Sequence, residues 1–253
     1  LECNYKNRGT GMKDIVLIIG ASSDIGIGLI KSLDKECLVL AHYNNSDREL
    51  KRLLESGNVK MVMLKADLAI ESEVLSMLEE IEGKYGLPSK IIHLAAPRVE
   101  NIRFKDVKWD DYERDINIGL KSSFLILNKL LPKLAKERRG KVVLMLSSYV
   151  LGVPPKALSH YIIGKYAMLG LARSLSSEYS DKNIQINTVS PSMIETKFLD
   201  KINEKFVEIA AYNHPLKRNA KIHDVIPVIK MLISKESDYI NGVNIPITGG
   251  SVY

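Results

Sequence analysis

A tyrosine and a lysine four residues apart offer the clearest chemistry in this chain. They open and close the stretch Tyr161-Ile-Ile-Gly-Lys165, which follows an apolar run ending in Ser147 and Ser148. In a helix this spacing is about one turn, so the phenol and the ammonium would share a face. The plainer interpretation is a pair of solvated side chains.

Such a pair is suited to proton transfer. A free phenol has a pKa of about 10, too high for efficient exchange at neutral pH. A neighbouring ammonium favours the phenolate and lowers that pKa. A serine hydroxyl at the same point would hold a carbonyl oxygen beside the phenol. The residues therefore predict acid–base chemistry on a carbonyl or alcohol.

The composition is that of a globular protein with one large core. The chain has 253 residues, of which 45% are hydrophobic and 26% are charged. Its two cysteines, Cys3 and Cys37, argue against a disulfide framework and favour a reducing, cytoplasmic location. We find no metal-ligand spacing, membrane-length apolar run or signal peptide, so we expect no metal and no membrane association.

The net charge of +6 favours an anionic ligand, such as a phosphorylated cofactor or an acidic carrier. Nucleic acid is not an expected partner, because the basic residues are spread along the chain.

Apolar strand patterns alternate with helical patterns. We expect strands at 15–19, 38–41, 59–65, 90–94, 141–146, 185–190 and 243–247. We expect helices after the first strand, at 47–55, 70–85, 109–135, around 161, and at 199–212 and 223–233. This alternation predicts an α/β fold, a single-domain Rossmann-type doubly wound parallel sheet with helices on both faces. We assign it to residues 12–253 and expect residues 1–11 to be a disordered extension or an upstream remnant.

A glycine-containing turn follows the first strand. The segment Gly20-Ala-Ser-Ser-Asp-Ile-Gly26 separates that strand from an apolar helical pattern. Strand, turn and helix in this order place a diphosphate at a helix N-terminus, although ordinary strand-to-helix turns can look the same. A ligand is expected at the carboxyl ends of the strands.

Together these motifs resemble those of the short-chain dehydrogenase/reductase family, in particular the group that includes the 3-oxoacyl-[acyl carrier protein] reductases. The similarity runs from about residue 13 to residue 250. The family's Asn-Asn-Ala-Gly motif falls on His93-Leu-Ala-Ala96, and its catalytic Asn falls on Asn117. Its Tyr-x-x-x-Lys falls on Tyr161 and Lys165. Its Ser falls on Ser148, whose spacing of thirteen residues to the tyrosine we prefer to that of Ser147.

The resemblance implies a nicotinamide cofactor and hydride transfer between it and a carbonyl or alcohol carbon. Tyr161 would be the general acid/base, and Lys165 would lower its pKa and hold the nicotinamide ribose. Ser148 would orient the carbonyl, and Asn117 would interrupt its helix and hold a water in a proton relay. The cofactor-binding residues would be Gly20, Ser22, Ser23, Ile25, Gly26, Tyr43, Asn44, Asp67, Leu68, Ala95, Tyr161, Lys165, Ile194 and Thr196, with the two serines on phosphate oxygens.

The end of the second strand favours NADP(H) over NAD(H). Residues 41–46, Ala-His-Tyr-Asn-Asn-Ser, contain no acid that would bind a ribose 2′-hydroxyl and repel a 2′-phosphate. The usual arginine is also missing, so Asn44, Asn45, Ser46 or backbone amides would hold the phosphate. His42 either contributes or is a strand-end residue with no ligand role.

Several residues depart from the family pattern. Asp24 replaces the second motif glycine, where a carboxylate repels a diphosphate but suits a helix N-terminus. His93 and Leu94 replace Asn-Asn, which removes hydrogen bonds that brace the central strands in relatives. Ser192 replaces a glycine, and Thr248 stands where an aspartate is common.

Three functions stay open at this point. The first is reduction of acyl-thioester carbonyls in fatty acid biosynthesis, as by the 3-oxoacyl-[acyl carrier protein] reductases. The second is a dehydrogenase of sugars or other small alcohols, and the third is a non-catalytic dinucleotide-binding scaffold. We expect residues 193–215 to form a substrate-facing lid, and the resemblance implies a homotetramer.

Overall fold

A seven-stranded parallel sheet forms the centre of the computed structural model, which describes residues 14–199 and 204–252. The strands are β1 (Ile15–Ile19), β2 (Leu38–Tyr43), β3 (Lys60–Lys65), β4 (Lys90–His93), β5 (Gly140–Met145), β6 (Ile184–Pro191) and β7 (Asn244–Ile247). Their order is β3-β2-β1-β4-β5-β6-β7. The predicted Rossmann-type sheet is confirmed. The expectation for residues 1–11, and the start of the helix expected at 199–212, lie outside the described residues.

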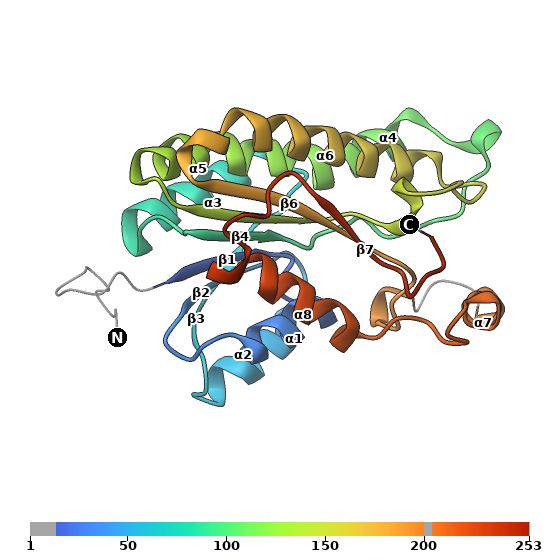
Figure 1. Ribbon diagram of the computed structural model, residues 1–253, viewed down its shortest axis with the longest axis horizontal. Coiled ribbons are helices and arrows are strands. Elements are labelled where there is room, and N and C mark those ends of the chain that lie inside the picture. The colour runs from blue at the N-terminus through green and yellow to red at the C-terminus, as the bar shows by residue number, and fades with distance from the viewer. Residues whose placement is uncertain (1–13, 200–203, 253) are drawn as a thin grey trace.

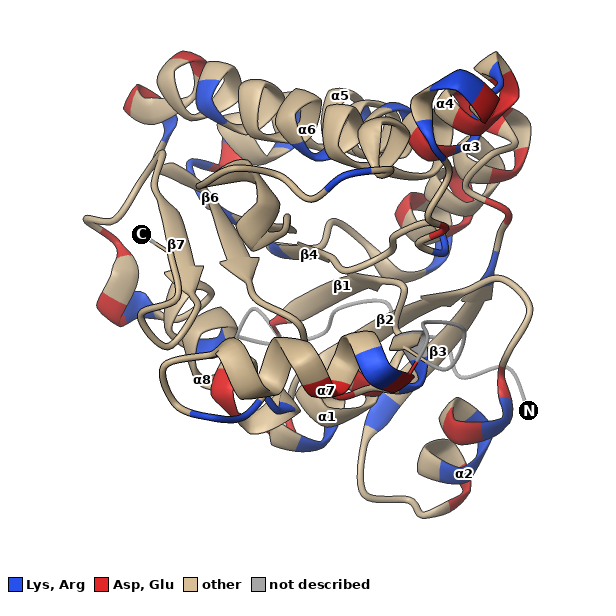
Figure 2. Ribbon diagram, turned by 90° about the vertical axis from the view of Figure 1, so that its right-hand side faces the viewer, with Lys and Arg blue, Asp and Glu red and all other residues tan. Residues whose placement is uncertain are grey.

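Helices cover both faces of the sheet (Figure 1). One layer contains α3 (Glu71–Glu80), α4 (Trp109–Ile116), α5 (Ser122–Glu137) and α6 (Ser159–Glu178). The other contains α1 (Asp24–Ser32), α2 (Arg48–Glu55) and α8 (Ile222–Leu232). Helix α7 (Glu204–Asn213) stands apart from both layers, at the right of Figure 1 and nearest the viewer in Figure 2.

The apolar strand runs explain this layering. Residues Val16 to Ile19 of β1 are fully buried, and so are all residues of β5 and β6. A strand buried on both faces needs helices on both sides, since either face left in water would expose its side chains. Accordingly, one core packs under α3, α5 and α6, and the other under α1, α2 and α8. Within the described residues, no helix is long and apolar enough to cross a membrane.

The long helix expected at 109–135 is not continuous. A π-helical turn, η3 (Asn117–Lys121), separates α4 from α5. The interruption therefore begins at Asn117, the residue at which the resemblance placed it. A π turn adds a residue to the helical repeat and is frequent at functional sites.

The sheet leaves an opening where its order reverses. Strand β1 lies between β2 and β4, whose connections run to opposite faces. The turn after β1 then passes the end of β4 so closely that a Cβ on Gly20, which has φ +79°, would lie 2.8 Å from the Ala95 nitrogen. This is the crevice in which doubly wound sheets bind ligands.

Replacing Gly26 by alanine should destabilise the fold by about 2 kcal/mol, because the added Cβ would lie 2.4 Å from the Ala21 carbonyl oxygen. The exposed Gly83 has nothing within 4 Å of such a Cβ and makes a matched control. Urea unfolding of Gly26→Ala and Gly83→Ala measures both. Equal stability of the two variants would contradict the close packing of α1 on the turn.

Candidate active site

A cleft of about 550 Å³ opens at the carboxyl ends of the strands. Most of the predicted site residues line it, although they come from seven separate parts of the chain. These are Gly20, Ser22, Ser23, Ile25, Tyr43, Asn44, Asp67, Leu68, Ala95, Ser148, Tyr161, Lys165, Ile194 and Thr196. Gly26 and Asn117 are not among the lining residues. Gly26 acts instead through the close packing of α1 on the turn.

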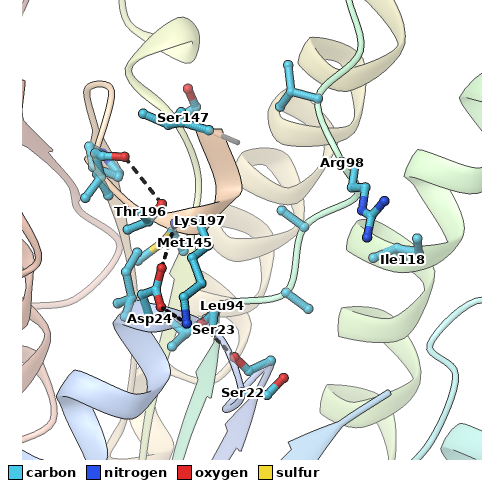
Figure 3. A pocket seen from close by; sticks show the side chains of 18 of the residues that line it. Ser22, Ser23, Asp24, Leu94, Arg98, Ile118, Met145, Ser147, Thr196 and Lys197 are labelled. Atoms are coloured by element: carbon cyan, nitrogen blue, oxygen red, sulfur yellow. Dashed lines mark hydrogen bonds and ion pairs between the residues drawn. The ribbon is translucent and has the colours of Figure 1, made fainter. Parts of the chain in front are cut away.

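Several residues that sequence reasoning did not assign to the site also line the cleft. Figure 3 shows Asp24 and Lys197 on one side of it and Arg98 on the other. Ser147, Met145 and Ile118 also belong to this set. Each stands within three residues of a predicted site position. Nearness to those positions was therefore the one feature of the sequence that could have predicted them.

The turn of residues 20–26, here called the cofactor turn, is held by its own hydrogen bonds. The Ser23 hydroxyl donates to the Gly20 carbonyl at 2.8 Å and accepts from the Gly26 amide at 3.1 Å. Ser23 is thus the N-cap of α1, where a serine satisfies a free helix amide. Ser23 also lines the cleft, and its expected contact with a phosphate oxygen stays a prediction.

His42 is buried and braces the cofactor turn from β2. Its Nδ1 lies 3.1 Å from the Gly20 amide, and its Nε2 lies 3.0 Å from the Ala66 carbonyl oxygen. These partners require a neutral ring with its proton on Nε2, and burial lowers the pKa of His42 in agreement. Of the two possibilities left open for His42, the structure therefore favours a role without a ligand.

Tyr161 and Lys165 lie side by side in α6, both almost completely buried. The Lys165 Nζ is 5.6 Å from the centre of the tyrosine ring and donates to the Met145 carbonyl at 2.9 Å. Burial lowers the pKa of Lys165 to about 8, with Asp115 opposing the change.

The expected lowering of the Tyr161 pKa is wrong for this structure. Burial, and then the nearby Tyr149, raise the pKa of Tyr161 above its usual value, while a hydrogen bond from Ser147 opposes the rise. The physical reason is that a phenolate loses its hydration at this depth, and the lysine is itself desolvated.

Of the two neighbouring serines, Ser147 is the one whose side chain acts to lower the pKa of Tyr161. Ser147 follows β5, is buried, and also accepts the Tyr149 amide at 3.3 Å. Ser148 begins a 3₁₀ turn and is half-buried at the wall of the cleft. Both serines line the cleft, so the preference for Ser148, which rested on its spacing to Tyr161, stays a prediction.

His93 braces β4 against the π turn. Its Nε2 lies 2.8 Å from the Ser122 hydroxyl, which donates to the Ile118 carbonyl at 2.6 Å. The expectation that replacing Asn-Asn removes the brace is thus corrected for His93. The same π turn directs the Ser122 amide to the Asn117 carbonyl, so that carbonyl is hydrogen-bonded within the helix.

A buried pair just before Tyr161 ties three elements together. His160 Nδ1 is 2.6 Å from the Asp115 carboxylate of α4, and Nε2 is 3.1 Å from the Glu100 carbonyl. Both side chains are almost fully buried. Because Glu100 lies two residues after Arg98, this pair holds one wall of the cleft against the helix that carries Tyr161.

The arrangement provides a buried acid–base pair, a hydroxyl beside it, and a glycine turn at a helix N-terminus on the opposite wall. Among the described residues, no group of three or more His, Cys, Asp or Glu is placed to hold a metal ion. The close approach of Gly20 to Ala95 leaves backbone, without side chain, facing a ligand at the turn. These features fit a dinucleotide whose diphosphate lies at α1.

Replacing Lys165 by methionine should change how stability depends on pH. Below about pH 8 both folded and unfolded chains carry the ammonium, so its burial penalty is complete. Between pH 8 and 10.5 only the unfolded chain stays protonated, and the penalty falls. The unfolding free energy of the variant minus that of the wild type should therefore fall by on the order of 2 kcal/mol across this range. Urea titrations at several pH values measure it, with exposed Lys35→Met as the control whose difference stays flat.

Comparisons with known proteins agree with this geometry. A family model described as Enoyl-(Acyl carrier protein) reductase matches residues 20–251. A 3-oxoacyl-[acyl-carrier-protein] reductase of Staphylococcus aureus is 27% identical over 245 residues, covering 94% of this chain and 98% of the relative.

Solved structures share the fold. A 3-oxoacyl-[acyl-carrier protein] reductase from Brucella melitensis has a TM-score of 0.83 at 22% identity, over 94% of this chain and 90% of that one. A gluconate 5-dehydrogenase from Burkholderia cenocepacia, in complex with NADP and tartrate, has a TM-score of 0.84 at 18% identity, over 94% of each chain. This chain belongs to the short-chain dehydrogenase/reductase family and is an NAD(P)-dependent oxidoreductase.

Proposed function

We propose that this protein is an NADP(H)-dependent carbonyl reductase whose substrates are 3-oxoacyl thioesters. The observation that carries the proposal is the buried Tyr161–Lys165 pair beside a serine hydroxyl, in a cleft facing the cofactor turn. The substrate class is supported by the similarity to the Staphylococcus aureus reductase over nearly the whole of both chains.

The nicotinamide, when bound, supplies the hydride. Tyr161 donates a proton to the oxygen of the reduced carbonyl and withdraws it in the reverse direction. Lys165 holds the nicotinamide ribose and places its positive charge beside the phenol, where it stabilises the phenolate as the proton leaves. Asn117 acts from the π turn by holding a water that links Lys165 to solvent.

Ser147 orients the substrate carbonyl in this proposal. A hydroxyl that acts on the phenol can also donate to the carbonyl oxygen beside it, which fixes the distance to both the proton and the hydride. Ser148 stands one residue farther along the wall of the cleft.

The preference for NADP(H) rests on the end of β2. Tyr43, Asn44, Asn45 and Ser46 line the cleft there, and none of them carries a negative charge. The next acid, Asp47, is paired with Lys51 at 2.7 Å. A 2′-phosphate would meet amides and a hydroxyl at this point instead of an unpaired carboxylate.

We further propose a cytoplasmic homotetramer. Exposed apolar side chains on the outer helices support an assembly, including Trp109 in α4, Phe124 in α5 and Tyr166 in α6.

Tyr161→Phe tests the proposed acid. It should lower NADPH-dependent turnover of acetoacetyl thioesters by at least about 100-fold, because the proton donor is lost. The dissociation constant for NADPH should change by less than about threefold and stay below that for NADH. Stopped-flow turnover and fluorescence titration measure the two effects. Retained turnover would remove Tyr161 as the acid, and turnover of small alcohols or sugars alone would replace the substrate class.

The two serines are distinguished by a matched pair of variants. Ser147→Ala should lower kcat about 100-fold, because the donor to the carbonyl oxygen is lost. Ser148→Ala, with the same change one residue away, should retain kcat within about threefold. The reverse order of effects would return the role to Ser148, as the spacing to Tyr161 suggests.

A further inference from the structure

The aspartate that replaces a motif glycine makes a contact across the cleft entrance. The Asp24 Oδ2 accepts the backbone amide of Lys197 at 2.7 Å, and its Oδ1 lies 3.7 Å from the Lys197 Nζ (Figure 3). The two residues are 173 positions apart in the sequence. Asp24 is the first residue of α1, directly after the N-cap Ser23.

This contact anchors the loop of residues 192–199, here called the post-β6 loop. The loop is tied at its start by the Ser192 amide to the Ile247 carbonyl at 3.1 Å. Its middle is tied by the bridge between Ile194 and Ala220. The third tie, to Asp24, comes from the first residue of α1. It joins the loop that carries Ile194 and Thr196 to the turn on which a diphosphate would lie.

The charges of Asp24 and Lys197 also bear on how a diphosphate would bind. A lone carboxylate at the start of α1 would repel a diphosphate approaching the same helix end. The Lys197 ammonium stands close enough to offset that charge, and its side chain is 70% exposed. At 3.7 Å it is not held by a short hydrogen bond, so it can turn to meet a phosphate oxygen.

We propose that Asp24 and Lys197 form a cofactor latch, in which the Asp24 carboxylate holds the post-β6 loop through the Lys197 amide and the Lys197 ammonium both offsets Asp24 and binds the dinucleotide diphosphate. This inference rests on the cofactor site of the proposed function. In the latch, the carboxylate is a positioning group, and the ammonium is the group that touches the ligand.

A charge cycle on NADPH binding tests the latch. Lys197→Met keeps the backbone tie but leaves Asp24 unopposed, so it should weaken NADPH binding about tenfold. Asp24→Asn keeps an oxygen for the Lys197 amide and removes the charge. The double variant should therefore bind about threefold more tightly than Lys197→Met alone. Fluorescence titration of the intact protein measures all four forms. Lys35→Met, between α1 and β2 at the amino ends of the strands, is the control that should bind as the wild type.

The backbone tie has a readout that needs no cofactor. Hydrogen exchange of the Lys197 amide in the free protein should be faster in Asp24→Ala than in the wild type, and Asp24→Asn should restore the slow rate. If Asp24 had no role in holding the loop, the exchange rate of the Lys197 amide would be the same in Asp24→Ala as in the wild type.

The outcomes separate the latch from the proposed function. Normal NADPH binding by Lys197→Met, equal effects of that change in both Asp24 backgrounds, or an exchange rate unaffected by Asp24→Ala would each overturn the latch while leaving the reductase in place. Failure of the wild type to bind either NADPH or NADH would overturn the proposed function and the latch together.

Discussion

The structure depends on one constraint, the reversal of strand order beside β1. Because β2 and β4 flank β1 and their connections leave on opposite faces, the sheet opens at the carboxyl end of β1. Residues from both sides of the sheet can meet only there. The cofactor turn comes from one helix layer and the Tyr161–Lys165 pair from the other, so the cleft between them is a direct consequence of the topology.

Buried polar contacts help to hold the walls of this cleft. His42 fixes the cofactor turn to β2 and β3, and His93 fixes β4 to the π turn. His160 and Asp115 join the loop after β4 to α4 and α6. Hydrogen bonds of this kind are directional, so each sets an orientation that apolar contacts alone would leave free. The cost is a set of desolvated groups, most visibly His93, whose pKa burial lowers to about 3.

Two of the departures from the family pattern make hydrogen bonds of their own. His93 stands in place of an asparagine and reaches Ser122 with its ring nitrogen. Asp24 stands in place of a glycine and accepts the Lys197 amide from a distant loop. In both cases the substituted residue brings a longer polar side chain, and a partner lies at the end of it. The departures therefore preserve the architecture of the site by different hydrogen bonds.

Much of this molecule was predictable from local sequence. The apolar runs that become β1, β5 and β6, the alternation with helices, and the identity of the Tyr161–Lys165 pair all follow from patterns within a few residues. Burial of both strand faces then implies helices on both sides. The spacing of residues could not predict where each side chain points or which other residues it contacts. Ser147 and Ser148 differ by one position, and only the fold of the turn after β5 shows that Ser147 is buried and Ser148 is half-buried.

The remaining features needed the tertiary structure for the same reason. The expectation of a lowered pKa for Tyr161 took only its charged neighbour into account. In the folded chain, burial of the side chain raises this pKa, and the spacing of residues in the sequence does not reveal burial. Likewise, Asp24 meets Lys197 across 173 residues of sequence, and His42 meets the Gly20 amide from the adjacent strand. The sequence by itself determined the strands, the helices and the chemical groups available. The packing of the two helix layers around the crevice decided which of those groups touch, because contacts between distant segments exist only once the sheet has formed.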